Sequence, residues 1–361
     1  LIVGGGLAGA ALSLALARGG LSSILLDAVP AETRAEPGFD GRAYALAAGS
    51  VNLLRGIGVW GAVAAQAQPM TAIEIFDGEI GHPGPVRLRF EGAELDTFPF
   101  AVLLEDRFLR AALLDAVAAE PLITQRAPFR ATAQAAGSAG ATVTGEEGSV
   151  LRGAVTVAAD GRRSPLAASA GLRWSGRRYG QTGLVCAIDL AAEHGGLARQ
   201  VFYPGGPFAV LPLPGARAQI VWSERTALAQ RIAGLGDAGY LHEIRRRLGG
   251  LAEAKGLAGR RWAYPLEIAL AYDFAAPRLA LLGDAAHAMH PIAGQGFNVG
   301  LRDVATLAEV LAEAKRRGED IGAAAVLARY QRWRRFDSTA LGGVTDALNR
   351  LFSTGSGPVR T

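Results

Sequence analysis

Cysteine and lysine are nearly absent from this 361-residue sequence. Its one cysteine, Cys186, excludes an internal disulfide framework and any zinc or iron–sulfur site built from several thiolates. Lysine occurs only at Lys255 and Lys315, so almost every basic residue is an arginine. The formal net charge is only +4, and we expect no nucleic-acid binding from this diffuse basic character.

Long apolar runs are also scarce. Residues 1–17 carry no charge, but a signal peptide needs a basic region before its apolar core, and the glycines among residues 4–9 favour a phosphate-binding turn. Because a strand before such a turn normally has several residues, we expect a short segment to precede Leu1. No other stretch is long and apolar enough to cross a bilayer. These observations favour a cytoplasmic protein and leave open a peripheral position on the inner face of a membrane.

The composition and the N-terminal pattern indicate a folded α/β protein. Hydrophobic residues make up 50% of the chain and charged residues 19%. A chain of this length exceeds the usual size of a single core, which predicts two domains or one domain with a large insertion. An apolar strand, a glycine turn, a helix of small residues and a second strand follow one another over residues 1–26. Such a βαβ unit predicts a doubly wound parallel sheet.

Alternation of apolar and polar residues begins near Thr71 and indicates a second layer. Strands joined by proline- and glycine-rich turns are predicted at 184–190, 198–203, 208–213 and 219–223. A helix is predicted to follow over 226–251. We therefore expect a Rossmann-like nucleotide-binding domain with an inserted antiparallel-sheet domain for the substrate and C-terminal helices. The first domain is assigned to 1–68, 105–170 and 276–345, the sheet domain to 69–104 and 171–275, and the start of a helical tail to 346–361.

A G-x-G-x-x-G motif lies between the first strand and the first helix. Its glycines lack a β-carbon, so the backbone can approach a pyrophosphate at the helix N-terminus. An aspartate ends the second strand, where its carboxylate can accept hydrogen bonds from a ribose. Together these features predict a dinucleotide site made by Gly4, Gly6, Leu7, Ala8, Gly9 and Asp27. A glycine-rich turn beside an ordinary surface aspartate is the alternative.

A second glycine-rich segment follows the apolar residues 279–282. A simple NAD dehydrogenase of the Rossmann type has no reason to carry it, which favours a different dinucleotide. The segment reads as a strand, a carboxylate, a turn and the start of a helix. Its candidate site residues are Gly283, Asp284, Pro291, Gly294, Gly296, Phe297 and Asn298.

This second segment resembles the GDAAH...HP.AGQG.N.G..D pattern of the class A flavoprotein monooxygenases, and within them of the ubiquinone-biosynthesis hydroxylases. The resemblance implies an FAD-binding domain of the glutathione-reductase type, with FAD as cofactor. It implies that Asp284 binds a ribityl hydroxyl and that the backbone amides of 296–298 face the flavin pyrimidine edge, where a helix N-terminus stabilises negative charge. Gly296 and Pro291 then position the flavin at the catalytic centre, and no side chain is assigned as acid or base.

Three further residues match positions of this family. Asp160, followed by Gly161, resembles the DG motif, which in the family is linked to FAD and NAD(P)H binding; a plain Asp-Gly turn before a helix is the alternative. Arg42 and Arg107 lie where the family places flavin-contacting arginines, and a solvated surface arginine is the alternative for each. The chain departs from the family at Asp27, where glutamate is more common. It also ends earlier than relatives usually do, so we expect a terminal helix to be missing.

Two histidines near the second segment invite a metal assignment. His287 and His290 are spaced i, i+3, but no third ligand accompanies them apart from Asp284, which the flavin is expected to occupy. We interpret both as positioning residues and predict no metal site.

The resemblance also implies the reaction, an FAD-dependent hydroxylation of an aromatic ubiquinone precursor such as a polyprenylated phenol. NAD(P)H would bind transiently, since the sequence has no second G-x-G-x-x-G, and reduced FAD would react with O2 to give a C4a-hydroperoxyflavin that transfers its distal oxygen. A dry cavity is needed to keep this species from decaying. We expect its apolar wall to consist of Phe202, Phe208, Leu211, Pro212, Val221 and Trp222. Ordinary sheet core is the alternative for these six.

Other functions stay open at this point. One is a related flavin reductase or dehydrogenase acting on an isoprenoid or quinone, and another is a non-catalytic flavoprotein scaffold of a biosynthetic complex. A flavin-dependent halogenase is disfavoured, because it needs a lysine between flavin and substrate and both lysines lie on polar helices. The expected partners are a small aromatic or prenylated substrate and O2. Association with a membrane or a complex and the oligomeric state stay open.

Overall fold

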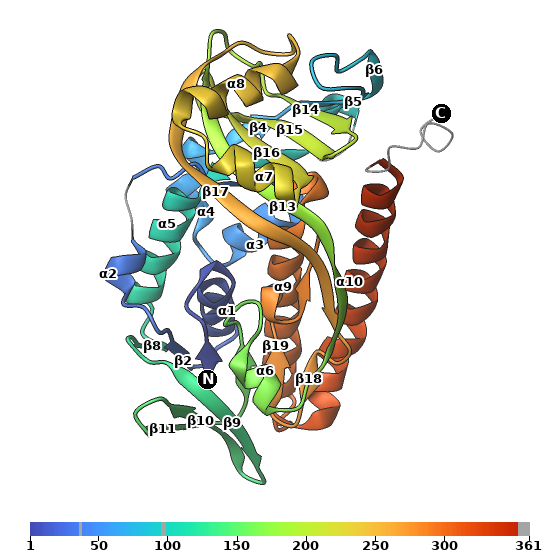
Figure 1. Cartoon of the computed structure of the whole chain (residues 1–361). Coiled ribbons are helices and arrows are strands. Elements are labelled where there is room, and N and C mark those ends of the chain that lie inside the picture. The colour runs from blue at the N-terminus through green and yellow to red at the C-terminus, as the bar shows by residue number, and fades with distance from the viewer. Residues whose placement is uncertain (36–37, 95–98, 353–361) are drawn as a thin grey trace.

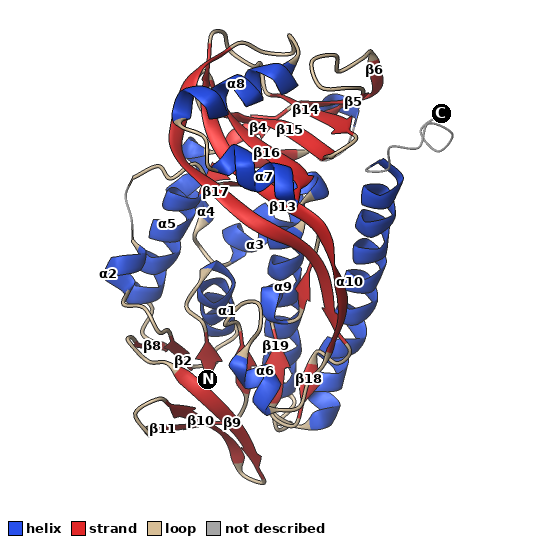
Figure 2. Ribbon diagram, viewed as in Figure 1, coloured by secondary structure: helices blue, strands red, loops and turns tan. Residues whose placement is uncertain are grey.

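The computed structural model describes residues 1–35, 38–94 and 99–352 (Figure 1). A six-stranded sheet with its helices forms the lower part of the view, and an eight-stranded sheet forms the upper part (Figure 2). Two long strands, β13 (Trp174–Leu190) and β17 (Ala254–Ala271), belong to the upper sheet and run down along the lower part. The predicted α/β class with a second, sheet-rich part is therefore confirmed.

The lower sheet has the predicted doubly wound character. Five of its strands pair in parallel, and the sixth, β18, pairs antiparallel at the edge. The strand order is β18 (Ala275–Ala276), β19 (Leu279–Leu281), β12 (Thr156–Ala158), β1 (Ile2–Val3), β2 (Ser23–Leu26) and β8 (Ile123–Arg126). The main helices around it are α1 (Leu7–Arg18), α5 (Asp106–Ala119) and α9 (Gly296–Arg316). Its strands are short and apolar on both faces, as buried parallel strands require.

The upper sheet forms the second layer. Its strand order is β20 (His287–Ala288), β17, β13, β16 (Arg217–Arg225), β15 (Gly206–Leu213), β14 (Leu197–Tyr203), β5 (Ala72–Asp77) and β6 (Val86–Glu91). Neighbours pair antiparallel as predicted, except β14 and β5, which are parallel. Helices α7 (Thr226–Ala233) and α8 (Asp237–Leu248) pack on one face of this sheet over a buried apolar cluster. That leaves the other face of the sheet toward the first domain.

Two sequence predictions in this region were wrong. The single helix expected over 226–251 is two helices, because Gly236 is extended at the start of α8 and Gly249 ends it with a left-handed φ of 51°. Strand β17 was not predicted, and Lys255, which was expected on a polar helix, lies in it. Most of its residues are half-buried or exposed, so its sequence lacks the regular alternation that marks a strand with one buried face.

Smaller elements complete the fold. A three-stranded sheet consists of β3 (Ala43–Ala47), β7 (Ala101–Glu105) and β4 (Gln68–Met70) and contacts β15. In the chain, β3 and β4 precede β5 and β6 of the upper sheet, and β7 follows them. A separate three-stranded sheet consists of β9 (Ala131–Gly137), β10 (Gly140–Gly145) and β11 (Val150–Gly153). The short helices are α2 (Ala31–Arg34), α3 (Ala48–Gly56), α4 (Trp60–Val63) and α6 (Pro165–Ser169).

The last helix, α10 (Ala324–Phe352), links the two layers. Near its start the Tyr330 hydroxyl donates to Leu281 O at 2.6 Å in the first domain. Near its end the Phe352 ring stacks on Phe202 of the upper sheet, with 4.2 Å between the ring centroids. The expected boundary at 345/346 falls inside this continuous helix and is wrong as a structural break. Residues 353–361 of the expected tail lie outside the described residues. Across the described ranges, we find no helix with the length and apolar character that a membrane span requires.

A buried ion pair joins α8 to the upper sheet. Arg247 is almost completely buried; its Nη2 donates to Glu224 on β16 at 3.1 Å and its Nη1 to Glu243 at 2.6 Å. Its guanidinium also lies 3.8 Å from the centroid of the Trp222 ring. A charge removed from water is stabilised by its ion-pair partner. The loss of one partner therefore leaves the other charge buried and uncompensated, which lowers the stability of the fold.

We therefore predict that Arg247→Ala lowers the free energy of unfolding by about 3–5 kcal/mol, since it leaves Glu224 buried without its main partner. Denaturant unfolding measures this. The neighbouring Arg246 is half-exposed and pairs with Glu243 at the surface, so Arg246→Ala should change the free energy by about 0.5 kcal/mol or less. Equal losses in the two variants would contradict the prediction.

Candidate active site

The carboxyl ends of three neighbouring parallel strands bring the sequence motifs together. Strand β1 pairs with β12, and β12 pairs with β19. Gly4, Asp160 and Gly283 follow the ends of these strands, so the glycine turn, the DG turn and the second segment share one edge of the sheet. Ligands of open α/β sheets bind at this edge. The edge is therefore the candidate dinucleotide site.

The first glycine turn is tightly packed on one side and open on the other. Gly4 has a φ of 108°, and a β-carbon there would lie 2.2 Å from the carbonyl oxygen of Ala159. A β-carbon at Gly9 would lie 1.9 Å from the carbonyl oxygen of Gly4. At Gly6, the residue before α1, a β-carbon would meet no protein atom within 4 Å. The first amides of α1, which lack partners within the helix, thus face a space that a phosphate can enter.

Asp27 supports this turn directly. Its carboxylate accepts hydrogen bonds from the amides of Gly5 at 2.6 Å and Val29 at 2.7 Å, and Arg34 lies 3.7 Å away. The side chain therefore holds the glycine turn against β2. Its predicted ribose contact stays a prediction, and it would add to these backbone bonds.

The second segment presents a carboxylate and a helix start at the same edge. Asp284 is about half-exposed, and its Oδ2 lies 3.3 Å from Arg162 Nε of the DG turn. Gly294 has a φ of 62°, and Gly296 begins the 21-residue helix α9. A β-carbon at Gly296 would meet no protein atom within 4 Å. The α9 N-terminus and Pro291 before it are thus placed where the resemblance puts the flavin ring, and their role stays a prediction.

Asn298 and Phe297 fix the position of α9. Asn298 Oδ1 accepts hydrogen bonds from the Ala47 amide at 2.9 Å and from the Ser50 hydroxyl at 2.7 Å. The Phe297 ring lies 4.8 Å from that of Tyr44, centroid to centroid. The Asn298 side chain therefore binds β3 and α3, and only its backbone amide stays a candidate flavin contact.

A buried charge network lies directly behind the second segment. The carboxylate of Asp303 is fully buried and accepts hydrogen bonds from the Gly283 amide at 2.9 Å, from His287 Nε2 at 2.7 Å and from Arg334 Nε at 2.6 Å. Burial alone would lower the pKa of His287, but the charge and hydrogen bond of Asp303 raise it on balance. Asp303 closes the motif that suggested the family, yet sequence reasoning did not select it as a functional residue. The predicted positioning role fits His287.

His290 lies in a different environment. It is buried, its Nδ1 accepts from the Ile292 amide at 3.3 Å, and burial lowers its pKa to about 4. It is therefore neutral at physiological pH. Within the described ranges, no group of three or more metal-ligating side chains occurs.

The two predicted arginines are held by carboxylates. Arg42 Nε donates to Asp40 at 2.7 Å, and its Nη2 lies 3.5 Å from Asp106. Arg107 Nε donates at 2.7 Å to the fully buried Glu105, and its guanidinium lies 4.5 Å from the Phe108 ring centroid. Neither is a freely solvated arginine. Both side chains are partly exposed, and their flavin contacts stay predictions.

Asp160 forms the DG turn as predicted from the motif. Its Oδ2 accepts from the Ser164 hydroxyl at 2.8 Å, and Ser164 in turn caps α6 by accepting from the Ala167 amide at 3.1 Å. Gly161 and Arg163 both have positive φ, of 82° and 62°. Burial raises the pKa of Asp160, although the Ser164 hydrogen bond acts to lower it.

The six predicted wall residues divide between the two faces of the upper sheet. Phe208 and Trp222 are fully buried in the cluster beneath α7 and α8, on the face turned away from the first domain. Pro212 pairs with Ala218 of that cluster, so it shares this face. The prediction was wrong for these three, because side chains alternate along a strand and both parities had been selected.

The other three wall residues face the first domain. Val221 and Phe202 each lie between neighbours that belong to the α7/α8 cluster, so strand alternation turns them to the opposite face. Leu211 packs with Leu103 of β7 and Met70 of β4 on that same face. These three residues stay candidates for the substrate wall.

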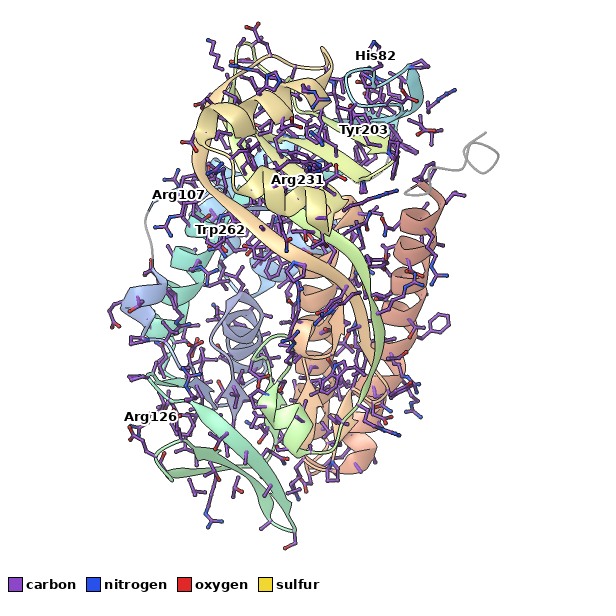
Figure 3. All side chains as sticks on the ribbon, viewed as in Figure 1. His82, Arg107, Arg126, Tyr203, Arg231 and Trp262 are labelled. Carbon is purple, nitrogen blue, oxygen red and sulfur yellow. The ribbon has the colours of Figure 1, made fainter. Side chains whose placement is uncertain are left out.

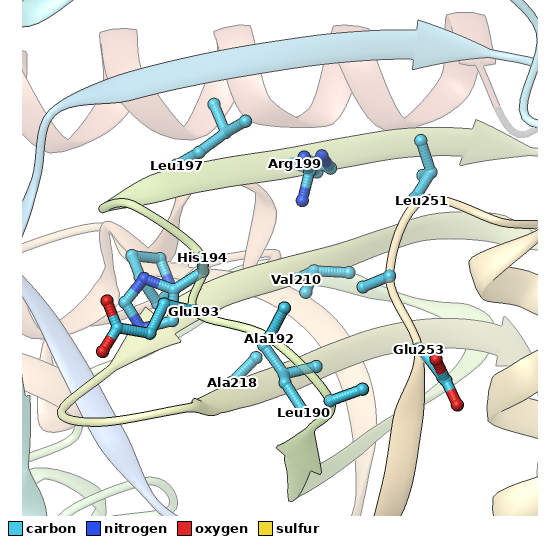
Figure 4. Close-up of a pocket in the computed structure, with 13 residues that line it drawn as sticks. Leu190, Ala192, Glu193, His194, Leu197, Arg199, Val210, Ala218, Leu251 and Glu253 are labelled. Carbon is cyan, nitrogen blue, oxygen red and sulfur yellow. The ribbon is translucent and has the colours of Figure 1, made fainter.

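A cavity of about 200 Å³ on the α7/α8 side is not the predicted substrate site (Figure 4). Its lining includes Leu190, His194, Arg199, Val210 and Pro212. Because Pro212 and Val210 turn away from the strand ends described above, this cavity lies across the sheet from the glycine turns.

The comparisons with known proteins agree with this geometry. A family model described as "FAD binding domain" matches residues 1–340. The chain belongs to this family. The ubiquinone hydroxylase UbiL of Rhodospirillum rubrum is 41% identical over 359 residues, which cover 99% of this chain and 82% of that protein. The 3-demethoxyubiquinol 3-hydroxylase of Escherichia coli is 34% identical over 365 residues, covering 99% of this chain and 91% of that protein.

Solved structures share the fold. PqsL from Pseudomonas aeruginosa has a TM-score of 0.82 and 24% identity, covering 98% of this chain and 95% of that one. The p-nitrophenol 4-monooxygenase PnpA from Pseudomonas putida has a TM-score of 0.80 and 20% identity, covering 99% and 90%. The predicted family, FAD-binding fold and cofactor are thus confirmed.

The described residues fit FAD. The open space at Gly6 and Gly296 lies at two helix N-termini, which attract the phosphates and a negatively charged flavin edge. The exposed carboxylate of Asp284 is a suitable acceptor for ribityl hydroxyls between them. Sequence reasoning missed Trp262 and Tyr264 of β17, which face the same region, although aromatic residues two positions apart could have marked one face of a strand.

We predict that Gly6→Val abolishes FAD binding without unfolding the protein, because its side chain would occupy the space before α1 and its β-carbon would meet no protein atom within 4 Å. Flavin absorbance per protein and the melting temperature measure the two effects. Gly61→Val is the matched control, since its β-carbon also meets no protein atom but lies on exposed α4. A Gly6→Val protein that keeps full flavin occupancy would refute the phosphate assignment.

We further predict that Asp303→Asn destabilises the protein by about 3–5 kcal/mol at pH 6, since it removes the fully buried one of the two carboxylates that pair with Arg334. The raised pKa of His287 adds stability that is complete below its unfolded value of about 6.5 and is lost as pH rises through the folded value. The difference in the free energy of unfolding between wild type and variant should therefore become smaller as the pH becomes alkaline.

Denaturant unfolding at several pH values, with FAD in excess, measures this difference in the free energy of unfolding. Asp337→Asn is the matched control, because Asp337 also pairs with Arg334 but is partly exposed and makes no contact with His287 among the described interactions. The difference in the free energy of unfolding between wild type and Asp337→Asn should stay constant over the same pH range. A difference for Asp303→Asn that does not change with pH would exclude a contribution of His287 protonation to the stability.

Proposed function

We propose that this protein is an FAD-dependent monooxygenase that hydroxylates an aromatic precursor of ubiquinone, with NAD(P)H and O2 as co-substrates. The observation that carries the proposal is the meeting of the first glycine turn, the DG turn and the second segment at one strand edge, with the other face of the upper sheet turned toward the first domain. The relatives UbiL and 3-demethoxyubiquinol 3-hydroxylase, which are named as hydroxylases acting in this chemistry, support it.

The chain's own residues would position the reactants and exclude water. When bound, FAD supplies the redox chemistry, taking a hydride equivalent from the nicotinamide and activating O2. The amides at the α9 N-terminus would stabilise negative charge on the flavin edge. Phe202 and Val221, buried or half-buried on the sheet face opposite, would hold the aromatic ring in an apolar environment that slows side reactions with water.

The same sheet face extends outward to an exposed apolar edge. Directly paired strand residues point to one face, and a row of such pairs runs from Val221 through Ala209, Gln200 and Ile75 to Leu88. On the edge strand β6, Leu88 and Phe90 pair with Ile75 and Ile73 of this face, and both are about half-exposed. Since exposed apolar side chains on one face usually mark a binding surface, this row supports a path for a polyprenyl tail leaving the ring site.

The direct test is hydroxylation by the FAD-loaded protein. A phenolic polyprenyl compound, NADH or NADPH, and isotopically labelled O2 are supplied, and the product is analysed by mass spectrometry. We expect one labelled oxygen on the ring and an oxidation of NAD(P)H that accelerates when the phenol is present. A reduced, unlabelled product would instead indicate a flavin reductase. NAD(P)H oxidation that no phenol accelerates would indicate a scaffold.

The tail path gives a separate prediction. Leu88→Arg should raise the KM for a prenylated phenol about tenfold, since burying a leucine against an apolar chain contributes about 1.5–3 kcal/mol. The KM for the same phenol without its tail should not change. Leu122→Arg is the matched control, an exposed leucine just before β8 in the first domain. An equal effect on both phenols would place the tail elsewhere.

We propose, in addition, peripheral contact with a membrane through the β6 edge. A tail that leaves the sheet beside Leu88 would emerge next to Phe90, and both exposed side chains suit the interface of a bilayer. Flotation with lipid vesicles would detect the contact, and its loss in Leu88→Arg would tie it to this edge.

A further inference from the structure

Two aromatic side chains of β17 form a stacked pair on the face of the upper sheet that looks toward the first domain. The rings of Trp262 and Tyr264 are 6.2 Å apart between centroids and nearly parallel, at 6°. They pair with Val185 and Gly183 of β13, whereas the intervening Leu184 lies in the cluster under α7 and α8. The pair therefore lies on the same face as Val221, at the opposite end from β6. Figure 3 labels Trp262 beside Arg107, at the level where the sheet meets the first domain.

The inner ring of this pair is rigidly held. Trp262 Nε1 donates to the carbonyl oxygen of Asp40 at 2.7 Å. The guanidinium of Arg42 lies 4.7 Å from the Trp262 ring centroid, and Asp40 fixes this arginine in turn. An aromatic ring under a guanidinium and with its N–H satisfied is a preorganised platform.

The outer ring is open to solvent. Tyr264 is 36% exposed, although the two rings stack. Burial raises the pKa of its phenol; the positive charges of Arg42 and Arg162 act against this rise, and the carboxylates of Asp40 and Asp106 add to it. Arg162 comes from the DG turn and is itself about half-exposed. An accessible aromatic surface thus lies within the electrostatic influence of two arginines from the first domain, Arg42 paired with Asp40 and Arg162 paired with Asp284.

This combination suits one class of ligand, a planar heterocycle that carries phosphates. Bases stack on aromatic side chains, and guanidinium groups bind phosphate oxygens. FAD itself is accounted for by the glycine turn at Gly4–Gly9 and the α9 N-terminus. The proposed reaction needs a second dinucleotide, and the sequence holds a single G-x-G-x-x-G.

We propose that a pyridine dinucleotide docks on the Trp262–Tyr264 stack, with one of its rings against Tyr264 and its phosphates toward Arg162. This inference rests on the proposed function, which requires NAD(P)H. It places the nucleotide at the β17 end of the sheet face and the aromatic substrate toward β14, so the two can approach the flavin edge from different sides. A half-exposed stacking surface without a glycine turn of its own is consistent with a ligand that visits and leaves.

The test is the binding of NADP+ and of NAD+ to the FAD-loaded protein, measured by isothermal titration calorimetry without aromatic substrate. Tyr264→Leu should raise the dissociation constant at least about tenfold, since it removes one stacking platform. Tyr264→Phe keeps the ring and should bind like wild type. Tyr272→Leu is the matched control, because Tyr272 is also an exposed tyrosine beside an arginine, Arg173, but lies outside the stack.

Arg162→Gln should weaken both nucleotides, and a larger effect on NADP+ than on NAD+ would place the extra phosphate of NADP+ at this arginine. Unchanged binding in Tyr264→Leu would overturn the docking site and leave the proposed function intact. Loss of flavin absorbance in Tyr264→Leu would also overturn it, since the stack would then belong to FAD. Failure of the wild type to bind either nucleotide would overturn both the docking site and the proposed function.

Discussion

The carboxylate of Asp303 is removed from water and yet accepts three hydrogen bonds, from the Gly283 amide, His287 and Arg334. Burying a charge is costly unless such partners offset the lost hydration, so each of these groups is held where the carboxylate needs it. The donors come from the loop after β19, from β20 and from α10, while Asp303 belongs to α9. One side chain thus sets the position of Asp284 relative to the α9 N-terminus, and the candidate flavin site depends on that spacing.

The upper sheet gives this site a second wall with two different ends. One face is covered by α7 and α8, beneath which Arg247 and Trp222 pack. On the other face, aromatic rings and arginines gather at β17, and exposed apolar side chains gather at β6. Because a sheet is stiff across its hydrogen-bonded strands, the two ends stay at a fixed separation. Such a face can present different chemistry to two ligands at once.

The errors of the sequence predictions mostly concern the sheet face on which a side chain lies, and less often the kind of element that contains the residue. Phe208 and Trp222 were correctly expected in strands of the second domain, but they point away from the first domain. Along a strand the face changes with every residue, and only the pairing with neighbouring strands decides which face is covered. The helix expected over 226–251 fails for a local reason, since α7 ends at Ala233, Gly236 is extended before α8, and Gly249 ends α8 with a left-handed φ that favours glycine.

The sequence by itself determined the glycine turns, the carboxylates beside them and the family that they indicate, because backbone access to a phosphate requires glycine at defined local spacing. It did not determine which distant groups meet. The pairing of Asp303 with Arg334, the stack of Trp262 on Tyr264 facing the first domain, and the convergence of Gly4 with Asp160 are set by strand order and helix packing. These arrangements depend on burial against segments far away in the chain, and a local sequence pattern does not show which distant segments pack together.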